Sequence, residues 1–166
     1  MRYHLAQVNI GRVRAPMEDP LMDGFRNALD RINAIADAAP GFVWRLQSPA
    51  GNATSIHAWD DPRLLINMSV WQSLEALHAY VYASDHTPFV RARREWFEPF
   101  EGPMLALWWI PAGHIPTIAE AKEKLQRLAA EGPTPEAFTF RRSFPTPGAP
   151  SRPGPGVDAE FCRGPA

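Results

Sequence analysis

The chain has 166 residues, of which 45% are hydrophobic and 21% are charged, so it can form one globular domain with a sizeable core. Its net charge of -1 and pI near 6.5 argue against binding to nucleic acid, and no segment reaches the roughly 20 apolar residues of a membrane span. We therefore expect a cytoplasmic protein, in which a single cysteine excludes an internal disulfide framework.

The first predicted strand covers residues 3–10, where apolar and polar side chains alternate. The alternation places Asn9 on the same face as Gln7. A helix follows, because Asp19-Pro20 is a typical helix start and an apolar stripe continues from it as far as Pro40-Gly41.

Two short strands and one long strand are predicted next. The short ones lie at residues 42–47 and around Ile56, His57 and Trp59. The long strand, residues 64–71, is apolar enough to be central in a sheet. Its two faces carry Leu65, Asn67, Ser69 and Trp71 on one side and Leu64, Ile66, Met68 and Val70 on the other.

The second half of the chain continues the alternation of helices and strands. Ser73 is placed to cap one helix, and Thr87-Pro88 begins another after a polar break. Residues 104–110 form an apolar run that suits a buried strand. A capping box of Thr117 and Glu120 begins the last helix, and a closing strand is expected at residues 138–140.

This order predicts a mostly antiparallel sheet with helices on one face, the ferredoxin-like α+β fold. The strands at 64–71 and 104–110 are apolar on both sides, so the other face of the sheet requires cover. A second copy of the chain is the simplest cover, and we expect a homodimer. We assign residues 1–144 to this domain and the Pro- and Gly-rich residues 145–166 to a flexible tail.

Several segments resemble a known family: RLLINMSVWQSLEALHAYVY, SDHTPFVRARREWF, and the later LWWIPAGHIPTIAEA with LAAEGPTPEAFTF. They resemble an uncharacterised bacterial family that is catalogued as a domain of unknown function, over about residues 3–144. That family is similar in fold to the antibiotic-biosynthesis-monooxygenase group of dimeric α+β barrels. The resemblance therefore implies a dimeric α-β barrel.

The resemblance does not choose a reaction, because the wider superfamily contains cofactor-free quinone-forming oxygenases, haem-binding enzymes and lactone isomerases. Our leading hypothesis is a monooxygenase-like enzyme that acts on an aromatic or enolisable hydrophobic substrate without a cofactor. One alternative is a non-catalytic module that binds a hydrophobic molecule or a partner protein. The other is a haem-dependent enzyme of the same fold.

His86 is the first candidate for a catalytic residue. It precedes the helix start at Thr87-Pro88, where the positive end of the helix dipole disfavours an imidazolium, so a neutral ring could act as a general base. The resemblance implies that the family has a histidine at this position. Arg91 and Arg94 follow one turn later and could stabilise developing negative charge, or pair with glutamates on a solvated face.

The haem alternative would use the same residues, with His86 as the iron ligand and Arg91 or Arg94 paired with propionates. Haem-degrading members of the superfamily, however, place a histidine in the second half of this helical stretch, where the present chain has none.

Polar and aromatic side chains on the predicted strands and helices are the candidates for substrate contacts. Each has a structural alternative, because buried asparagines often bond the backbone and aromatic residues at helix or strand spacing are usually core. The candidates are Asn9, Asn67, Trp71, His78, Tyr82, Trp96 and Trp108.

The motifs of several other chemistries are missing. The sequence has no G-x-S-x-G elbow, no nucleotide-binding glycine loop and no paired histidines at zinc-ligand spacing. We therefore expect no metal site and no cofactor.

Overall fold

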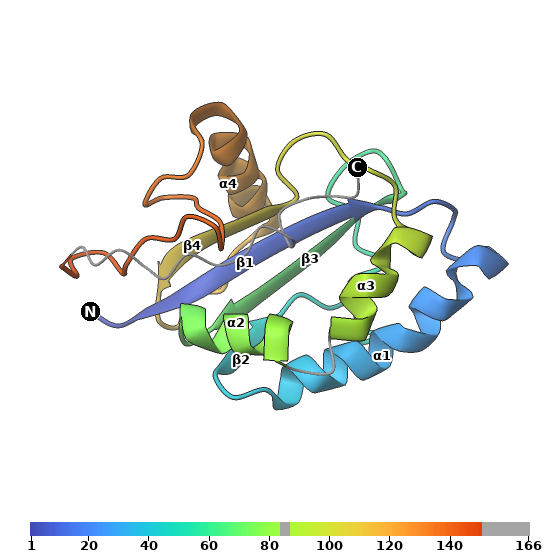
Figure 1. The fold of residues 1–166 in the computed structure, drawn as a ribbon, viewed down its shortest axis with the longest axis horizontal. Helices are drawn as coiled ribbons and strands as arrows, with labels where there is room; N and C mark the ends of the chain where they lie inside the picture. Colours follow the sequence, from blue (N-terminus) through green and yellow to red (C-terminus); the bar gives the residue numbers. More distant parts are fainter. Residues whose placement is uncertain (84–86, 151–166) are drawn as a thin grey trace.

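The computed structural model describes residues 1–83 and 87–150. Its regular elements in chain order are β1 (Tyr3–Arg12), the 3-10 helix η1 (Pro20–Met22), α1 (Asp23–Ala38), β2 (Phe42–Arg45), β3 (Leu64–Trp71), α2 (Leu74–Ala83), α3 (Thr87–Trp96), β4 (Leu105–Pro111) and α4 (Ile118–Glu131). The strands form one antiparallel sheet in the order β2-β3-β1-β4 (Figure 1). With α1 between β1 and β2, and α2 and α3 between β3 and β4, this is the ferredoxin-like topology. The predicted fold class is confirmed.

Strand β3 has the predicted bounds and pairs with β1 along its whole length. The register sets Asn67 opposite Asn9 and Ser69 opposite Gln7. Because residues opposite one another in a sheet point to the same face, these four polar side chains share one face. Asn67 is the exposed residue of β3, whereas the other residues of the strand are buried.

Three predicted helix starts are confirmed by side-chain caps. Asp19, Ser73 and Thr117 each accept a backbone N–H from the first turn, at 2.8, 3.1 and 3.1 Å respectively. The Asp19 cap begins η1, which runs directly into α1. Gly132 ends α4 with a positive φ of 72°, which glycine adopts without strain.

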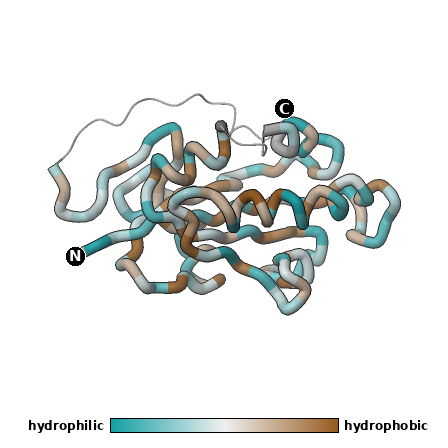
Figure 2. Tube along the Cα trace, turned by 90° about the horizontal axis from the view of Figure 1, so that it is seen from below, coloured by the Kyte–Doolittle hydropathy of each residue, from teal (hydrophilic) through white to brown (hydrophobic). Residues whose placement is uncertain are grey.

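Helices α1, α2 and α3 cover one face of the sheet, as Figure 1 shows. Leu77 and Val81 of α2 pack with Trp71 of β3, and Phe25 of α1 packs with Leu65. Figure 2 shows hydrophobic residues concentrated in the middle of the fold and hydrophilic residues along its outer loops. The predicted layer of helices is therefore present, and the structure places it on the face of the sheet that carries Asn67.

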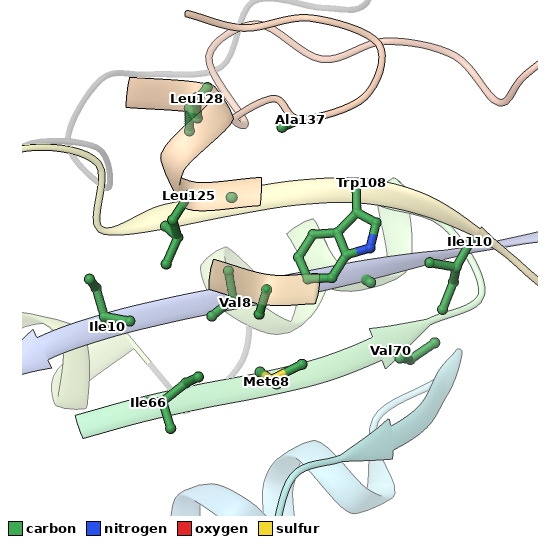
Figure 3. Packing of buried hydrophobic residues seen from close by; sticks show 13 residues of the cluster. Val8, Ile10, Ile66, Met68, Val70, Trp108, Ile110, Leu125, Leu128 and Ala137 are labelled. Carbon is green, nitrogen blue, oxygen red and sulfur yellow. The ribbon is translucent and has the colours of Figure 1, made fainter. Parts of the chain in front are cut away.

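The opposite face of the sheet is covered by the same chain. Leu125 and Leu128 of α4 pack over Val8 and its neighbours on the strands, as Figure 3 shows. Ile56 and Trp59, both partly buried, pack against the same cluster. The apolar surface that led us to expect a partner subunit is thus buried within one chain, and the homodimer stays a prediction.

The strand expected around Ile56 and Trp59 is wrong. Residues 46–63 form turns and irregular structure instead. Side-chain contacts hold this segment, since Lys122 Nζ donates a 2.8 Å hydrogen bond to the Ala58 carbonyl and lies 5.3 Å from the centre of the Trp59 ring. Its apolar residues are therefore buried without strand pairing.

The chain after α4 packs beside β4 without forming the predicted closing strand. Phe138 exchanges two backbone hydrogen bonds of 2.8 Å with Leu107, and these form an isolated bridge. Trp109 Nε1 donates to the Phe144 carbonyl at 2.8 Å, which ties the chain to the sheet as far as Phe144. Residues 151–166, most of the predicted flexible tail, lie outside the described residues.

Candidate functional site

A cavity of about 140 Å³ lies between the sheet and the helices α1, α2 and α3. Its floor is polar and comes from β1 and β3, and its walls are mainly apolar. The wall residues are Phe25, Leu29 and Ile32 from α1, Leu77 and Val81 from α2, and Phe97 directly after α3. An apolar cavity with a few convergent polar groups is typical of a small-molecule site.

A wider and shallower hollow of about 490 Å³ lies beside the cavity. The two share Leu29 of α1 and Thr54 of the segment between β2 and β3. Glu18, Arg26 and Asp30 line only the outer hollow. The outer hollow and the cavity are therefore neighbours, beside α1 and the irregular segment 46–63.

Hydrogen bonds connect the polar floor of the cavity. Gln7 Nε2 donates to Asn67 Oδ1 at 2.7 Å and to Ser69 Oγ at 2.9 Å. Trp71 Nε1 donates to the same Ser69 oxygen at 2.8 Å. The network fixes the position of Asn67, and in the described part of the chain nothing accepts a hydrogen bond from its NH2 group. That group is available to a ligand.

An aromatic stack forms one wall of the cavity. The Trp71 indole, fully buried, stacks on the Tyr80 ring with 5.0 Å between centroids and 25° between planes. Phe42 meets the other side of the indole edge-on at 5.5 Å. Burial raises the pKa of Tyr80 above its ordinary value of 10.0, against the opposing effect of Arg45. The phenol is consequently neutral at physiological pH.

Arg45 lines the end of the cavity near β2, and each of its three guanidinium nitrogens donates a hydrogen bond within the protein. Its Nε lies 2.7 Å from Asp37 Oδ1 and its Nη2 lies 3.2 Å from Asp37 Oδ2, which is a bidentate ion pair. Its Nη1 donates to the Gly51 carbonyl at 2.7 Å. The positive charge of Arg45 is therefore balanced before any ligand binds.

Arg93 of α3 brings a second guanidinium to the cavity. Its Nη2 donates to the Ile10 carbonyl of β1 at 3.1 Å, and its guanidinium carbon lies 4.8 Å from the centre of the Phe97 ring. Gly11 permits this approach, because a Cβ there would lie 2.8 Å from Nη2 and 2.5 Å from Phe97 Cδ1. Burial lowers the pKa of Arg93.

With the site described, the comparisons with known proteins identify the family. The family described as Domain of unknown function (DUF3291) matches residues 4–153. The chain belongs to this family. The search of curated proteins finds no relative of this DUF3291 chain.

Several solved structures are similar to the DUF3291 chain. SnoaB from Streptomyces nogalater, described as a cofactor-independent oxygenase, is 20% identical, with 68% of this chain and 95% of that chain covered and a TM-score of 0.43. NE2512 from Nitrosomonas europaea, described as a protein of unknown function, is 13% identical, with 69% of this chain and 96% of that chain covered and a TM-score of 0.46. A monooxygenase from the gene ActVA-Orf6 of Streptomyces coelicolor, solved with nanaomycin D, is 19% identical, with 69% of this chain and 91% of that chain covered and a TM-score of 0.41. Likeness at this level concerns the fold alone.

The structure brings three of the predicted site residues together in the cavity of the DUF3291 chain. These are Asn9, Asn67 and Trp71. Asn9 is partly buried, and no hydrogen bond joins its side chain to another described residue. The two asparagines are register partners on β1 and β3, and their role as ligand contacts stays a prediction.

Four predicted contact residues lie away from the cavity. His78 and Tyr82 pack on one another, with 4.5 Å between ring centroids, behind Phe140. Trp96 packs edge-on against another core ring, and Trp108 lies on the opposite face of the sheet. Trp108 Nε1 donates to Glu120 Oε1 at 2.8 Å, so its polar atom is used within the fold.

The predicted catalytic residues are not placed in this cavity. Arg91 and Arg94 are exposed and do not line it. His86 lies outside the described residues, and its proposed role stays a prediction from the sequence.

Seven further polar residues that are not among the candidates selected from the sequence line the cavity. One signal was available for the strands, because Gln7 alternates with Asn9 and Ser69 alternates with Asn67. Arg93 had a weaker signal, since it lies four residues before the buried Phe97 on α3. The seven residues are Gln7, Asn33, Arg45, Thr54, Ser69, Tyr80 and Arg93.

The described residues do not fit haem. The lining of the cavity includes no described histidine or cysteine that could bind iron, and a space of about 140 Å³ is close to the roughly 150 Å³ that holds one benzene ring. Within residues 1–83 and 87–150, no cluster of three His, Cys, Asp or Glu residues could hold a metal ion. None of the described helices is long and apolar enough to cross a membrane.

Proposed function

We propose that the chain is a cofactor-independent oxygenase that acts on a small aromatic or enolisable hydrophobic substrate in the cavity above β1 and β3. The observation that carries the proposal is the polar floor inside apolar walls, with the NH2 group of Asn67 held toward a ligand by the Gln7 hydrogen bond. An apolar ring would fill the space, and a carbonyl oxygen would bond Asn67 and Asn9.

The proposed reaction begins with loss of a proton from a methylene group next to a carbonyl. Hydrogen bonds from Asn9 and Asn67 to the carbonyl oxygen would stabilise the enolate that forms. The enolate carbon then combines with O2, which accepts the electrons, and a proton completes a hydroperoxide. Loss of water leaves a new carbonyl, so that CH2 and O2 become C=O and H2O. His86 is the proposed base, by position in the sequence.

Trp71 and Phe97 would supply aromatic surfaces for the substrate at two different points along the cavity. Flat aromatic walls orient a flat substrate and exclude water from the reacting carbon. SnoaB is described as catalysing cofactor-independent oxygenation, but the proposal for this chain rests on its own cavity.

The second candidate function is a non-catalytic module that binds the same kind of molecule. One observation favours it: within the described residues, the cavity is lined by no histidine, aspartate, glutamate or cysteine. Its titratable groups are two arginines and a tyrosine whose pKa is raised. Neither residue type is a base at neutral pH.

The test measures oxygen uptake with 2-indanone, an enolisable ketone on one aromatic ring. The expected product is the diketone, with one atom of isotopically labelled O2 in the new carbonyl and the other in water. His86→Ala should abolish turnover, and the matched control His57→Ala, at an exposed histidine outside the cavity, should not. Turnover that persists in His86→Ala would end the role of that base. Saturable binding without oxygen uptake would favour the binding module.

A further inference from the structure

Within residues 1–83 and 87–150, one positive charge of the cavity has no carboxylate partner. Arg45 forms a bidentate ion pair with Asp37, whereas the described contacts of the Arg93 guanidinium are a backbone carbonyl and an aromatic face. Among the described residues, no carboxylate pairs with Arg93, and no aspartate or glutamate lines the cavity. The described lining therefore carries a net positive charge.

A guanidinium removed from water requires compensation for its lost hydration. It has five N–H donors, and among the described residues the Ile10 carbonyl accepts from one of those of Arg93. The Phe97 ring adds a cation–π contact, but a neutral ring does not neutralise the positive charge of the guanidinium. An anion that binds in the cavity would supply the missing acceptors. Its affinity would be increased because it replaces the hydration that the Arg93 guanidinium has lost.

The position of Arg93 also fixes where such an anion would bind. Nη2 lies against β1 at Ile10 and Gly11, and Asn9 lies on the same face as Gly11, two residues earlier. Asn67 is the register partner of Asn9, so both asparagines belong to this part of the floor. A planar carboxylate is the group that a guanidinium fork and neighbouring amide donors recognise best.

The volume of the cavity limits the rest of the ligand. A space of about 140 Å³ compares with the roughly 150 Å³ of a cavity that accepts one benzene molecule. Phe25, Trp71 and Phe97 supply aromatic walls. The inner cavity therefore accepts one flat ring, and any larger substituent would extend into the outer hollow at Leu29 and Thr54.

We propose that the ligand of this cavity is an aromatic carboxylate with a single ring, whose charge is balanced by Arg93 and whose oxygens bond Asn9 and Asn67. This assignment rests on the site of the proposed function, and the carboxylate would bond the two amides there in place of the ketone oxygen of the oxygenase substrate. Arg93 is the residue that selects for the anion, and the amide donors set its orientation.

The test titrates the full chain with benzoate and with benzamide, its neutral counterpart of the same shape, and follows tryptophan fluorescence and heat of binding. Benzoate should bind at least about tenfold more tightly than benzamide, since hydrogen bonds to a charged partner are the stronger kind. Arg93→Met should remove this preference and leave weak binding of both compounds. Arg31→Met, which removes an exposed charge from α1, should keep it.

The preference of the unaltered protein is decisive even where Arg93→Met fails to fold. Equal or tighter binding of benzamide would overturn the inference, as would the absence of saturable benzoate binding. Equal losses in Arg93→Met and Arg31→Met would also overturn it, because they would indicate a general effect of net charge.

Failure of this inference is separable from failure of the proposed function. Selective benzoate binding in a protein that never consumes oxygen would overturn the oxygenase and leave the anion site. Turnover of 2-indanone without any preference for benzoate would do the reverse.

Discussion

The side-chain amide of Gln7 donates a 2.7 Å hydrogen bond to Asn67 Oδ1, across the pair of strands at the centre of the sheet. The Asn67 carbonyl is thereby engaged by the protein, while its NH2 group remains a donor for a ligand. Gln7 is buried and Asn67 is exposed in the cavity, so the hydrogen bond links a side chain of the core to a side chain of the site. Gln7 is thus a positioning residue for Asn67.

Gln7→Met should test this relationship because it keeps the length of the side chain and removes the donor. We expect a loss of about 1–3 kcal/mol in the free energy of unfolding, since buried acceptors lose their partner. In a double-mutant cycle with Asn67→Ala, the two effects should be coupled by about 0.5 kcal/mol or more, as measured by urea denaturation.

The matched control for that cycle pairs Gln7→Met with Asn33→Ala. Asn33 lines the same cavity from α1 but forms no described hydrogen bond with Gln7. These two effects should add. Additivity in the Asn67 cycle as well would contradict the role assigned to Gln7.

Gly11→Ala should disturb the stability of the fold and the position of Arg93 together. A Cβ at Gly11 would lie 2.5 Å from Phe97 Cδ1 and 2.8 Å from Arg93 Nη2, both shorter than normal contacts. We expect a loss of about 1–3 kcal/mol, typical of overpacking, and weaker binding of benzoate. Calorimetry and the benzoate titration measure the two effects. An unchanged midpoint with unchanged affinity would show that Gly11 is not needed for the approach.

The sequence allowed the floor of the site to be predicted because it lies on strands, where alternation assigns each side chain to a face. Asn9, Asn67 and Trp71 follow from this period of two, and so do the Gln7–Ser69 and Asn9–Asn67 pairings once β1 and β3 are known to pair. Local caps were also predictable, since Ser73 and Thr117 act within a single turn of their own helices.

The walls of the site were harder to predict because they depend on how a helix is rotated against the sheet. Arg91, Arg93 and Arg94 are equally attractive from sequence, but only Arg93 shares the inward side of α3 with Phe97. The positions of charged residues do not show how a helix is rotated about its axis against the sheet when the helix has few apolar residues. We did not predict that α4 covers the second face of the sheet, for a related reason. The apolar stripe of an amphipathic helix shows that the helix packs on something, but not on which face of the sheet.

Glu120 should contribute a pH-dependent part of the stability of α4 and Trp108. Burial acts to raise its pKa, but hydrogen bonds from His114 and Trp108 outweigh burial, and the net pKa is lowered from 4.5. A lowered folded-state pKa stabilises the fold above pH 4.5, and this contribution is lost as the pH falls through the folded-state pKa.

Glu120→Gln should therefore destabilise the protein by about 1 kcal/mol or more at neutral pH and by much less in acid. Urea denaturation at several pH values measures the difference from the unaltered chain. Glu123→Gln serves as control, because Glu123 forms an exposed ion pair with Arg127 and should cost little at any pH. A pH-independent difference for Glu120→Gln would contradict the assignment.

Tyr80 should remain protonated throughout the neutral range and beyond, which decides whether the described cavity contains a base. Burial raises its pKa above 10.0, so the folded state favours the phenol over the phenolate. This contribution to stability is complete below pH 10 and is lost as the pH rises through the folded-state pKa.

We expect the difference in phenolate absorbance between the unaltered chain and Tyr80→Phe to stay near zero up to about pH 10. The reason is that the buried ring, stacked on Trp71, has little access to water. A phenolate that appears below that pH would instead make Tyr80 the base for the proposed oxygenation. If Tyr80 stays neutral, a proton-abstracting group for the proposed oxygenation must come from outside the described lining, and turnover by His86→Ala then tests whether that group is His86.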